Sequence, residues 1–375
     1  MKIGIITMHK VLNFGSALQA YALQRKLKEM GYESEIIDYD FPPKKRKKSS
    51  IRNTIYGIVV FLRALVMGFP QKGKKKRFEA FYDKFYHLSS KKYDVSTIDV
   101  DPPKYDVYMS GSDQVWNPRH IGKDANFLLA FAPKGVYKIS FASSFATSNI
   151  NDAYKEMYQK YLSDYVDISV REPSGARLVK ELTGREASVC CDPVFLLNKT
   201  QWDEIADTSK EKVKGRYILV YALSYMFDPY PELLGIINHV QSQLDCQVVY
   251  LNGRMEDFFR RHSVIKKSEG PADFVQLIRN AELVITSSFH GTAFSLIYEK
   301  PLIAIVRDND LEDSRISSLL QRLHAEKSIV PYNKGCMLSR QELYGLKNEG
   351  SIMENYIRES ENYLRNSLSK VKMHS

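Results

Sequence analysis

The residues best suited to chemistry in this sequence are polar side chains placed where predicted strands end. His290 follows the apolar run Leu283–Thr286 and directly precedes Gly291, which opens a predicted helix. Backbone N–H groups at a helix amino terminus favour phosphate or carboxylate, and an imidazole there can exchange a proton near neutral pH. Gly291 would let an anion approach the backbone closely. His290 is therefore either an acid–base group beside a bound anion or, alternatively, only a cap of the helix.

Two arginines end predicted strands in the same way. Arg171 closes the strand Asp167–Arg171, and an arginine in that position can make a bidentate contact with a carboxylate or phosphate. The alternative is a surface ion pair with a neighbouring acid such as Glu172. Arg307 follows the strand Leu302–Val306 and is a second candidate partner for an anion.

A polar and aromatic loop follows the predicted strand Tyr105–Ser110. Within this loop Asp113 could act as a base toward a sugar hydroxyl, and Trp116 could stack on the face of a sugar. The alternative is a local turn held by Asp113, with Trp116 in the core. The other loop residues suited to hydrogen bonding with a sugar are Ser112, Gln114 and Asn117.

Further candidates lie in the turn between the first predicted strand and helix. Asn13 and Gly15 make this a phosphate-friendly turn, but it lacks G-x-G-x-x-G and any Walker sequence, so neither a dinucleotide nor an ATP site is predicted. Ser144 follows another predicted strand, and Ser288 lies two residues before the histidine. No cluster of His, Asp or Glu has metal-ligand spacing, so no metal is predicted.

The elements that must position these residues alternate between strand and helix. A chain of 375 residues is too long for one ordinary core, and the alternation restarts after Asp192-Pro193. Strands separated by helices predict parallel, doubly wound sheets, which bind ligands at the carboxyl ends of their strands. We therefore predict an α/β protein of two Rossmann-like domains facing a cleft, residues 1–195 and 196–335. A helical tail, 336–375, is expected to pack back on the first domain.

The strands expected in the first domain are Lys2–Thr7, Glu35–Tyr39, Tyr105–Ser110, Lys138–Ala142, Asp167–Arg171 and Ser188–Cys191. Those expected in the second are Tyr217–Leu223, Gln247–Leu251, Leu283–Thr286 and Leu302–Val306.

One basic and apolar segment, residues 42–77, interrupts this alternation. It holds twelve Lys or Arg and no acid, which leaves 42 basic against 44 acidic residues in the rest of the chain. The formal net charge of +10 therefore belongs to this insertion, and nucleic-acid binding by the whole fold is not predicted. Its apolar part, Ile55–Phe69, is too short to span a bilayer. Either an interfacial helix attracted to anionic lipid or a buried core helix would explain it. The amino terminus reads as a strand without a signal peptide, so a cytoplasmic protein is expected.

Four motifs, in this order, resemble the polysaccharide pyruvyltransferase family. The resemblance runs from the first strand to about residue 310 and rests on Asn13–Leu23, Gly111–Asn117, Ser169–Glu172 and Ser288–Ala293 followed by Lys300-Pro301. It implies a glycosyltransferase-B-like fold. It also implies transfer of pyruvate from phosphoenolpyruvate to two hydroxyls of a sugar, which forms a cyclic ketal without a cofactor.

The resemblance also implies roles for individual residues. His290 matches the catalytic histidine, Arg171 matches an arginine that holds the anionic donor, and Asp113 matches an acid in a loop of the amino-terminal domain. Better-known members carry an arginine two residues before the histidine, where this sequence has Ser288. The anion site is then expected to draw its positive charge from elsewhere, with Arg307 and the helix start at Gly291 as candidates.

The implied acceptor is a galactose-like hexose in the repeat unit of a capsule or exopolysaccharide, either free or lipid-linked. With a lipid-linked acceptor, the basic segment 42–77 would hold the enzyme at the inner face of the cytoplasmic membrane. Two other functions remain open for the same fold. One is a glycosyltransferase that uses a sugar nucleotide, and the other is a non-catalytic factor in polysaccharide assembly.

Overall fold

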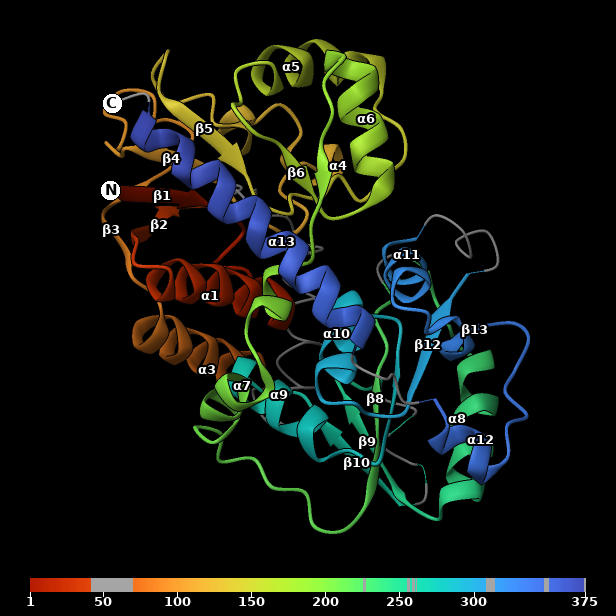
Figure 1. Ribbon diagram of the computed structural model, residues 1–375. Coiled ribbons are helices and arrows are strands. Elements are labelled where there is room, and N and C mark those ends of the chain that lie inside the picture. The colour runs from red at the N-terminus through yellow and green to blue at the C-terminus, as the bar shows by residue number, and fades with distance from the viewer. Residues whose placement is uncertain are drawn as a thin grey trace, which may run out of the picture.

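The computed structural model describes residues 1–41, 70–224, 227–254, 257, 260, 262–307, 314–346 and 351–373. In this part of the chain, two large sheets lie on either side of a shared layer of helices (Figure 1). The first sheet has the strand order β3-β2-β1-β4-β5 and the second β10-β9-β8-β11-β12-β13. All pairings in both sheets are parallel, so the predicted α/β class with two Rossmann-like sheets is confirmed.

The first sheet is built from residues before the Asp192-Pro193 junction. A short pair of strands, β6 and β7, continues it through single bridges from Asp167 to Ile139 and from Val170 to Ser143. The strands are β1 (Lys2–Ile6), β2 (Glu33–Tyr39), β3 (Leu88–Tyr93), β4 (Val107–Ser110), β5 (Tyr137–Ser140), β6 (Ser169–Val170) and β7 (Ser188–Val189). The helices are α1 (Phe14–Glu29), α3 (Pro70–Phe85), α4 (Pro118–Ile121), η1 (Ala125–Leu128), α5 (Asp152–Leu162) and α6 (Pro173–Thr183).

The second sheet follows η2 (Pro193–Leu196) and α7 (Lys199–Ala206). Its strands are β8 (Tyr217–Tyr221), β9 (Gln247–Leu251), β10 (Ser263–Lys266), β11 (Leu283–Thr286), β12 (Leu302–Val306) and β13 (Ile329–Pro331). Its helices are α8 (Glu232–Leu244), α9 (Pro271–Asn280), α10 (Phe289–Ile297), α11 (Arg315–Arg322), η5 (Glu326–Ser328) and α12 (Arg340–Tyr344).

Helix α1 is central because it packs against both halves of the molecule. One side lies on the first sheet, and the other contacts η2, α9 and α10. Its residues from Phe14 to Gln24 are therefore all buried, including polar Ser16 and Gln19, and the exposed charged residues lie in its last turn. Phe14 at its start stacks on Phe274 of α9, with 5.0 Å between the ring centroids. The start of α1 thus lies at the junction of the two sheets.

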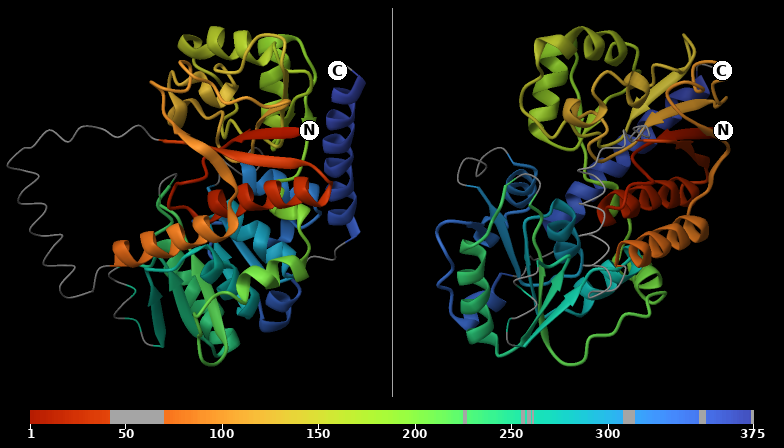
Figure 2. Two further views of the ribbon diagram at one scale, coloured as in Figure 1. Left: turned by 90° about the vertical axis from the view of Figure 1, so that its left-hand side faces the viewer. Right: turned by 180° about the vertical axis from the view of Figure 1, so that it is seen from behind.

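The last long helix, α13 (Ser351–Ser369), runs from the second sheet to the first and ends in η6 (Lys370–Met373) (Figures 1 and 2). The Ser360 hydroxyl accepts a hydrogen bond from the backbone N–H of Cys191 at 2.8 Å, and the Tyr137 hydroxyl donates to the Ser367 carbonyl at 2.9 Å. Lys370 forms an ion pair with Asp167 at 2.7 Å. The helix therefore ties the end of the chain to the first sheet.

Part of the predicted basic insertion belongs to the fold. Residues 70–77 form the first half of α3, so the predicted boundary at residue 77 is wrong. Arg77 pairs with Asp273 at 2.7 Å and with Glu211 at 3.1 Å, which joins α3 to the second half of the molecule. The predicted apolar helix Ile55–Phe69 lies outside the described residues. Among the described helices, none combines the length and apolar character that crossing a membrane would require.

Candidate active site

The first turns of α1 and α10 meet where the two sheets face each other. Helix α1 follows β1 and α10 follows β11, so each helix begins beyond the carboxyl end of a central strand. A Cβ atom added to Gly15 would lie 1.9 Å from Nδ1 of His290, and so only glycine fits between them. Asn13 and Ser288 cap the two helices by accepting a backbone N–H from their own first turn. Two helix amino termini at one place favour a bound anion.

Gly291 has a packing role that was not predicted. A Cβ atom at this position would lie 2.4 Å from Oγ1 of Thr286 at the end of β11. The glycine is therefore required for the close packing of α10 on its own preceding strand. That an anion also approaches its backbone stays a prediction.

Asp192 lies between the two residues that were predicted to flank one anion. Its Oδ2 accepts a hydrogen bond from Nη1 of Arg171 at 2.6 Å and lies 3.4 Å from Nε2 of His290. All three side chains are buried, with at most 6% of their surface exposed. Burial alone would raise the pKa of Asp192, but the charges of His290 and Arg171 hold it well below its usual range. Arg171 and His290 therefore do converge, and the chain itself places a carboxylate between them.

Arg171 is surrounded by further acids and an aromatic ring. Its Nε donates to Oε1 of Glu172 at 3.0 Å, and its Nη2 lies 3.7 Å from Oδ1 of Asp113. Its guanidinium carbon lies 4.2 Å from the ring centroid of Phe289. Burial lowers the pKa of Arg171, but the three carboxylates outweigh burial and raise it above its usual value. The predicted ion pair with Glu172 thus exists, in the interior and not on the surface.

Two nitrogens in this cluster are buried and make no hydrogen bond within the described residues: Nη2 of Arg171 and Nε2 of His290. Oε2 of Glu172 is a buried acceptor that also has no hydrogen-bond partner among the described residues. Buried polar atoms in folded proteins are almost always paired, so such atoms require an explanation. A ligand with both acceptor and donor groups would satisfy them.

Asp113 lies on the other side of Arg171, in a backbone conformation with φ of 67°. It is 6% exposed, and its Oδ2 accepts a hydrogen bond from the Ser16 hydroxyl of α1. Burial alone would raise the pKa of Asp113, but the charges of Arg171 and His290 and the Ser16 hydrogen bond hold it below its usual value. The side chain is therefore a carboxylate at neutral pH, which is the form that can accept a proton.

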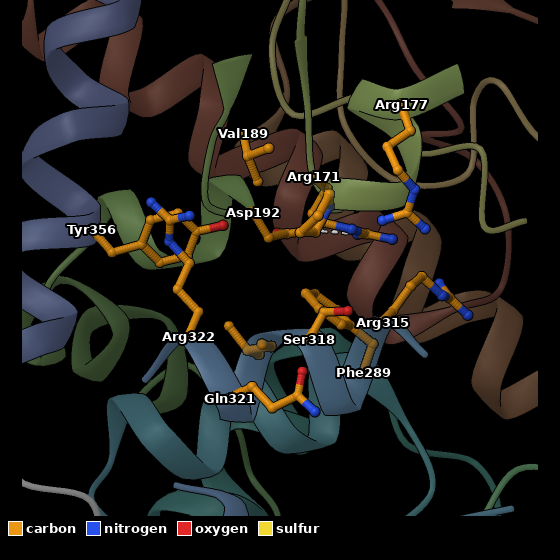
Figure 3. Close-up of a pocket in the computed structure, with 12 residues that line it drawn as sticks. Arg171, Arg177, Val189, Asp192, Phe289, Arg315, Ser318, Gln321, Arg322 and Tyr356 are labelled. Carbon is orange, nitrogen blue, oxygen red and sulfur yellow. Dashed lines mark hydrogen bonds and ion pairs between the residues drawn. The ribbon is translucent and has the colours of Figure 1, made fainter. Parts of the chain in front are cut away.

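A cavity of about 310 Å³ opens beside this cluster and is lined mainly by α6, α11, α13 and the start of α10 (Figure 3). Four arginines and one aspartate supply its charges, so the lining is strongly positive. In Figure 3, Arg171, Arg177 and Arg315 lie on one side, with Arg322 beside Tyr356 on the other. The lining residues are Arg171, Pro173, Arg177, Val189, Asp192, Phe289, Arg315, Ser318, Leu319, Gln321, Arg322 and Tyr356. The pocket suits a small anion.

Several other predicted binding residues form hydrogen bonds with the side chains of this cluster or with one another. The Ser112 hydroxyl donates to Oδ2 of Asp192 at 3.3 Å, and the Ser144 hydroxyl donates to Oε1 of Glu172 at 2.7 Å. The predicted substrate residues Gln114 and Asn117 bond to each other at 2.7 Å, and Asn117 also caps α4. Neither lines the cavity.

Trp116 and Arg307 differ from their predicted roles. Trp116 is 0% exposed, its Nε1 donates to the Phe127 carbonyl at 3.1 Å, and its ring packs against Phe145. The prediction that it stacks on a sugar is wrong, because no face of the ring is accessible. Arg307 lies over the ring of Phe227, 6.0 Å from its centroid, and does not line the cavity with the other arginines.

The sequence reading missed Asp192, Arg315 and Arg322 as site residues. Asp192 is a polar residue just beyond a strand, as Arg171 and His290 are. In the sequence it only marks the boundary between the two predicted domains, directly before Pro193. Arg315 and Arg322 are seven residues apart on α11, a spacing that places both on one helix face. That pattern could have indicated an anion site. The described residues hold no group of His, Cys, Asp and Glu side chains arranged to bind a metal ion.

The fold is similar to that of solved UDP-N-acetylglucosamine 2-epimerases. A putative enzyme of this kind from Listeria monocytogenes has a TM-score of 0.52 at 12% identity, covering 100% of this chain and 90% of its own. The enzyme from Rickettsia bellii has a TM-score of 0.54 at 11% identity, covering 99% and 97%. The Neisseria meningitidis enzyme, solved bound to UDP-GlcNAc, has a TM-score of 0.50 at 10% identity, covering 98% and 100%. These similarities establish a glycosyltransferase-B-like fold alone.

No curated protein matches the sequence. A family model does, over residues 13–309, and its description is polysaccharide pyruvyl transferase. The matched range begins at the cap of α1 and extends past Arg171, Asp192 and His290, so it includes the buried cluster. Because the match covers most of the chain, this protein belongs to the polysaccharide pyruvyl transferase family.

Proposed function

We propose that this protein transfers pyruvate from phosphoenolpyruvate to two hydroxyls of a galactose-like hexose in the repeat unit of a surface polysaccharide, forming a cyclic ketal. The observation that carries the proposal is the pair of buried nitrogens without a hydrogen-bond partner, Nη2 of Arg171 and Nε2 of His290, beside a cavity lined by arginines. Membership of the family supports the same reaction. An anionic donor at this place would have a guanidinium and an imidazole within reach.

The charge of the cavity supports phosphoenolpyruvate as the donor. A phosphate monoester carries about two negative charges at neutral pH, and the carboxylate adds one. Four arginines and one aspartate give the lining positive charge, part of which is balanced by the ion pairs of Arg171 with Asp192 and of Arg322 with Glu359. Arg171 and the start of α10 would hold one anionic group. Arg315, at the first position of α11, would supply the charge that Ser288 lacks for the other.

The proposed chemistry assigns a proton to each group. His290 gives a proton to the methylene carbon of phosphoenolpyruvate, which becomes a methyl group, and a sugar hydroxyl oxygen bonds to the neighbouring carbon. Asp113 accepts the proton of that hydroxyl. The bond from the same carbon to the phosphate oxygen then breaks, and the second hydroxyl oxygen closes the ring. Of the two hydroxyl protons, one replaces the proton that His290 gave and the other leaves with phosphate.

The acceptor and the location complete the proposal. We place the reaction in the cytoplasm, on an acceptor linked to lipid at the inner face of the membrane. Exposed Lys75 and Lys76 at the start of α3 support contact with anionic lipid. No cofactor is assigned to the reaction, since the donor carries the activated group.

A thermal unfolding titration tests the choice of donor. Phosphoenolpyruvate at about 100 times its Kd is expected to stabilise the protein by about 2.7 kcal/mol, because it binds only the folded state. UDP-GlcNAc, the ligand of the structurally similar Neisseria enzyme, is expected to leave Tm unchanged.

The variant R315M should lose most of the stabilisation by phosphoenolpyruvate. The matched control R216M, which removes an exposed arginine paired with Glu282, should retain it. Stabilisation by UDP-GlcNAc but not by phosphoenolpyruvate would reverse the assignment.

A further inference from the structure

Asp192 occupies the connection between the two sheets. It follows β7, the last strand of the first half, and precedes η2, after which the chain enters the second half. Its side chain is 1% exposed and contacts Ser112 and Arg171 from the first half and His290 from the second. One carboxylate therefore connects the two halves of the site at the point where the chain passes between them.

The orientation of this carboxylate is fixed by its backbone. Oδ1 accepts a hydrogen bond from the N–H of Val194 at 3.1 Å, so the other oxygen points into the site. That oxygen, Oδ2, meets Nη1 of Arg171 at 2.6 Å, Oγ of Ser112 at 3.3 Å and Nε2 of His290 at 3.4 Å. The contact with His290 lacks hydrogen-bond geometry, since Nε2 has no hydrogen-bond partner in the described part of the chain.

The two ring nitrogens of His290 have different surroundings. Nδ1 lies against the backbone of Gly15, where even a Cβ atom would be only 1.9 Å away. Nε2 faces the carboxylate of Asp192, and the charges nearby are those of Asp113 and Arg171. A carboxylate next to Nε2 favours a proton on that nitrogen and stabilises the charged ring. The proton that leaves His290 is then the one on Nε2.

We propose that Asp192 is a positioning residue for this site. It orients the imidazole of His290 with its proton on Nε2, and it holds the guanidinium of Arg171 beside that proton across the junction of the two sheets. Asp192 acts through these two residues and forms no bond to the reacting carbon. The kinetic part of this inference rests on the proposed pyruvyl transfer, whereas its structural part does not.

The substitution D192N tests the kinetic part, because asparagine keeps the shape of the side chain and removes its charge. We expect kcat to fall about 10²-fold, since the proton donor is no longer oriented. KM for phosphoenolpyruvate should stay the same or decrease, because Arg171 loses a competing anion. D192E, which keeps the carboxylate, should restore part of the lost kcat.

A matched control is D167N, which removes a carboxylate paired with Lys370 on the far side of the first sheet. It should leave kcat, KM and the pH profile unchanged. The proposal is overturned if D192N keeps the native kcat, if D192E recovers none of the lost kcat, or if the loss appears only in KM.

A measurement on the native protein covers the case in which D192N does not fold. In protein labelled with ¹⁵N-histidine, the ring nitrogens of His290 can be assigned by comparison with H290N. We expect the uncharged ring to carry its proton on Nε2, and a proton on Nδ1 would overturn the proposal. This result does not depend on any substrate. If the native protein forms no ketal from phosphoenolpyruvate while Nε2 carries the proton, the proposed function fails and the role of Asp192 in positioning His290 stands.

Discussion

H290N is expected to lower kcat by about 10²- to 10⁴-fold, with little change in the Kd for phosphoenolpyruvate. Asparagine fits the space beneath Gly15 and still offers a donor near Asp192, but it cannot deliver a proton to the methylene carbon of the donor. Binding should persist because Arg171 and the arginine-lined cavity are unchanged. Phosphate release measures kcat, and calorimetric titration with phosphoenolpyruvate measures Kd.

The matched control is H239N, on α8 of the second half, where Nε2 lies 2.8 Å from the Leu338 carbonyl. This variant should keep the native kcat even if its Tm falls. A native kcat in H290N would remove His290 from the chemistry. A loss of phosphoenolpyruvate binding in H290N without a loss of kcat at saturation would make the histidine a binding residue and not the acid.

R171M is expected to lower the free energy of unfolding by about 3–5 kcal/mol, the typical result of removing one partner from a buried ion cluster. Arg171 is 4% exposed and balances Asp113, Glu172 and Asp192, all of which are buried. Methionine fills a similar volume but removes the guanidinium from these three carboxylates and leaves His290 as the remaining partner of Asp192. R216M, which breaks an exposed ion pair, should change stability by only about 0–1 kcal/mol.

The pH dependence of stability should also differ between R171M and the native protein. In the native protein the pKa values of Asp113 and Asp192 lie below those of the unfolded chain. Their contribution to stability is therefore present above about pH 4 and is lost as the pH falls through the folded values. Without Arg171, the carboxyl of Asp113 loses the largest of the charges that lower its pKa, and burial should raise that pKa above its value in the unfolded chain. R171M should then become more stable as the pH falls from about 7 to about 5.

Urea unfolding at both pH values measures this difference. The native protein should show little change from these two residues over that range, because both their folded and unfolded pKa values lie below it. An R171M protein as stable as R216M, or one whose stability does not rise between pH 7 and pH 5, would contradict the description of the cluster.

The long buried strands and the strand-end residues could be predicted from the sequence because each is a local pattern. β8 and β12 are fully buried apolar runs, and His290 and Arg171 follow strands directly. The edge strands β3 and β10 were missed, since their side chains, except that of buried Tyr93, are half-buried or exposed and show no apolar run. These segments are strands because they pair with a neighbouring strand, and their own sequence has no hydrophobic pattern that would indicate it.

Residues whose role depends on a distant partner could not be predicted. Trp116 in a strand-end loop fits either a core or a binding surface, and the Phe127 carbonyl that fixes its indole belongs to a separate element. Arg77 appeared to be one of a run of solvated cations, yet its partners Glu211 and Asp273 lie far along the chain. Asp192 was recognised as a junction, but only the fold shows that the junction passes between Arg171 and His290.

The central claim is that pyruvate moves from phosphoenolpyruvate to a sugar at the Arg171–His290 cluster. The most direct test incubates the purified protein with uniformly ¹³C-labelled phosphoenolpyruvate and lipid-linked glycans extracted from the cells that produce it, followed by mass spectrometry of the glycans. The account predicts a glycan that gains a carboxyethylidene group with all of the label, one phosphate released for each group, and no such gain with H290N. An unlabelled glycan that instead gains a sugar from a supplied sugar nucleotide, or equal labelling by H290N, would contradict it.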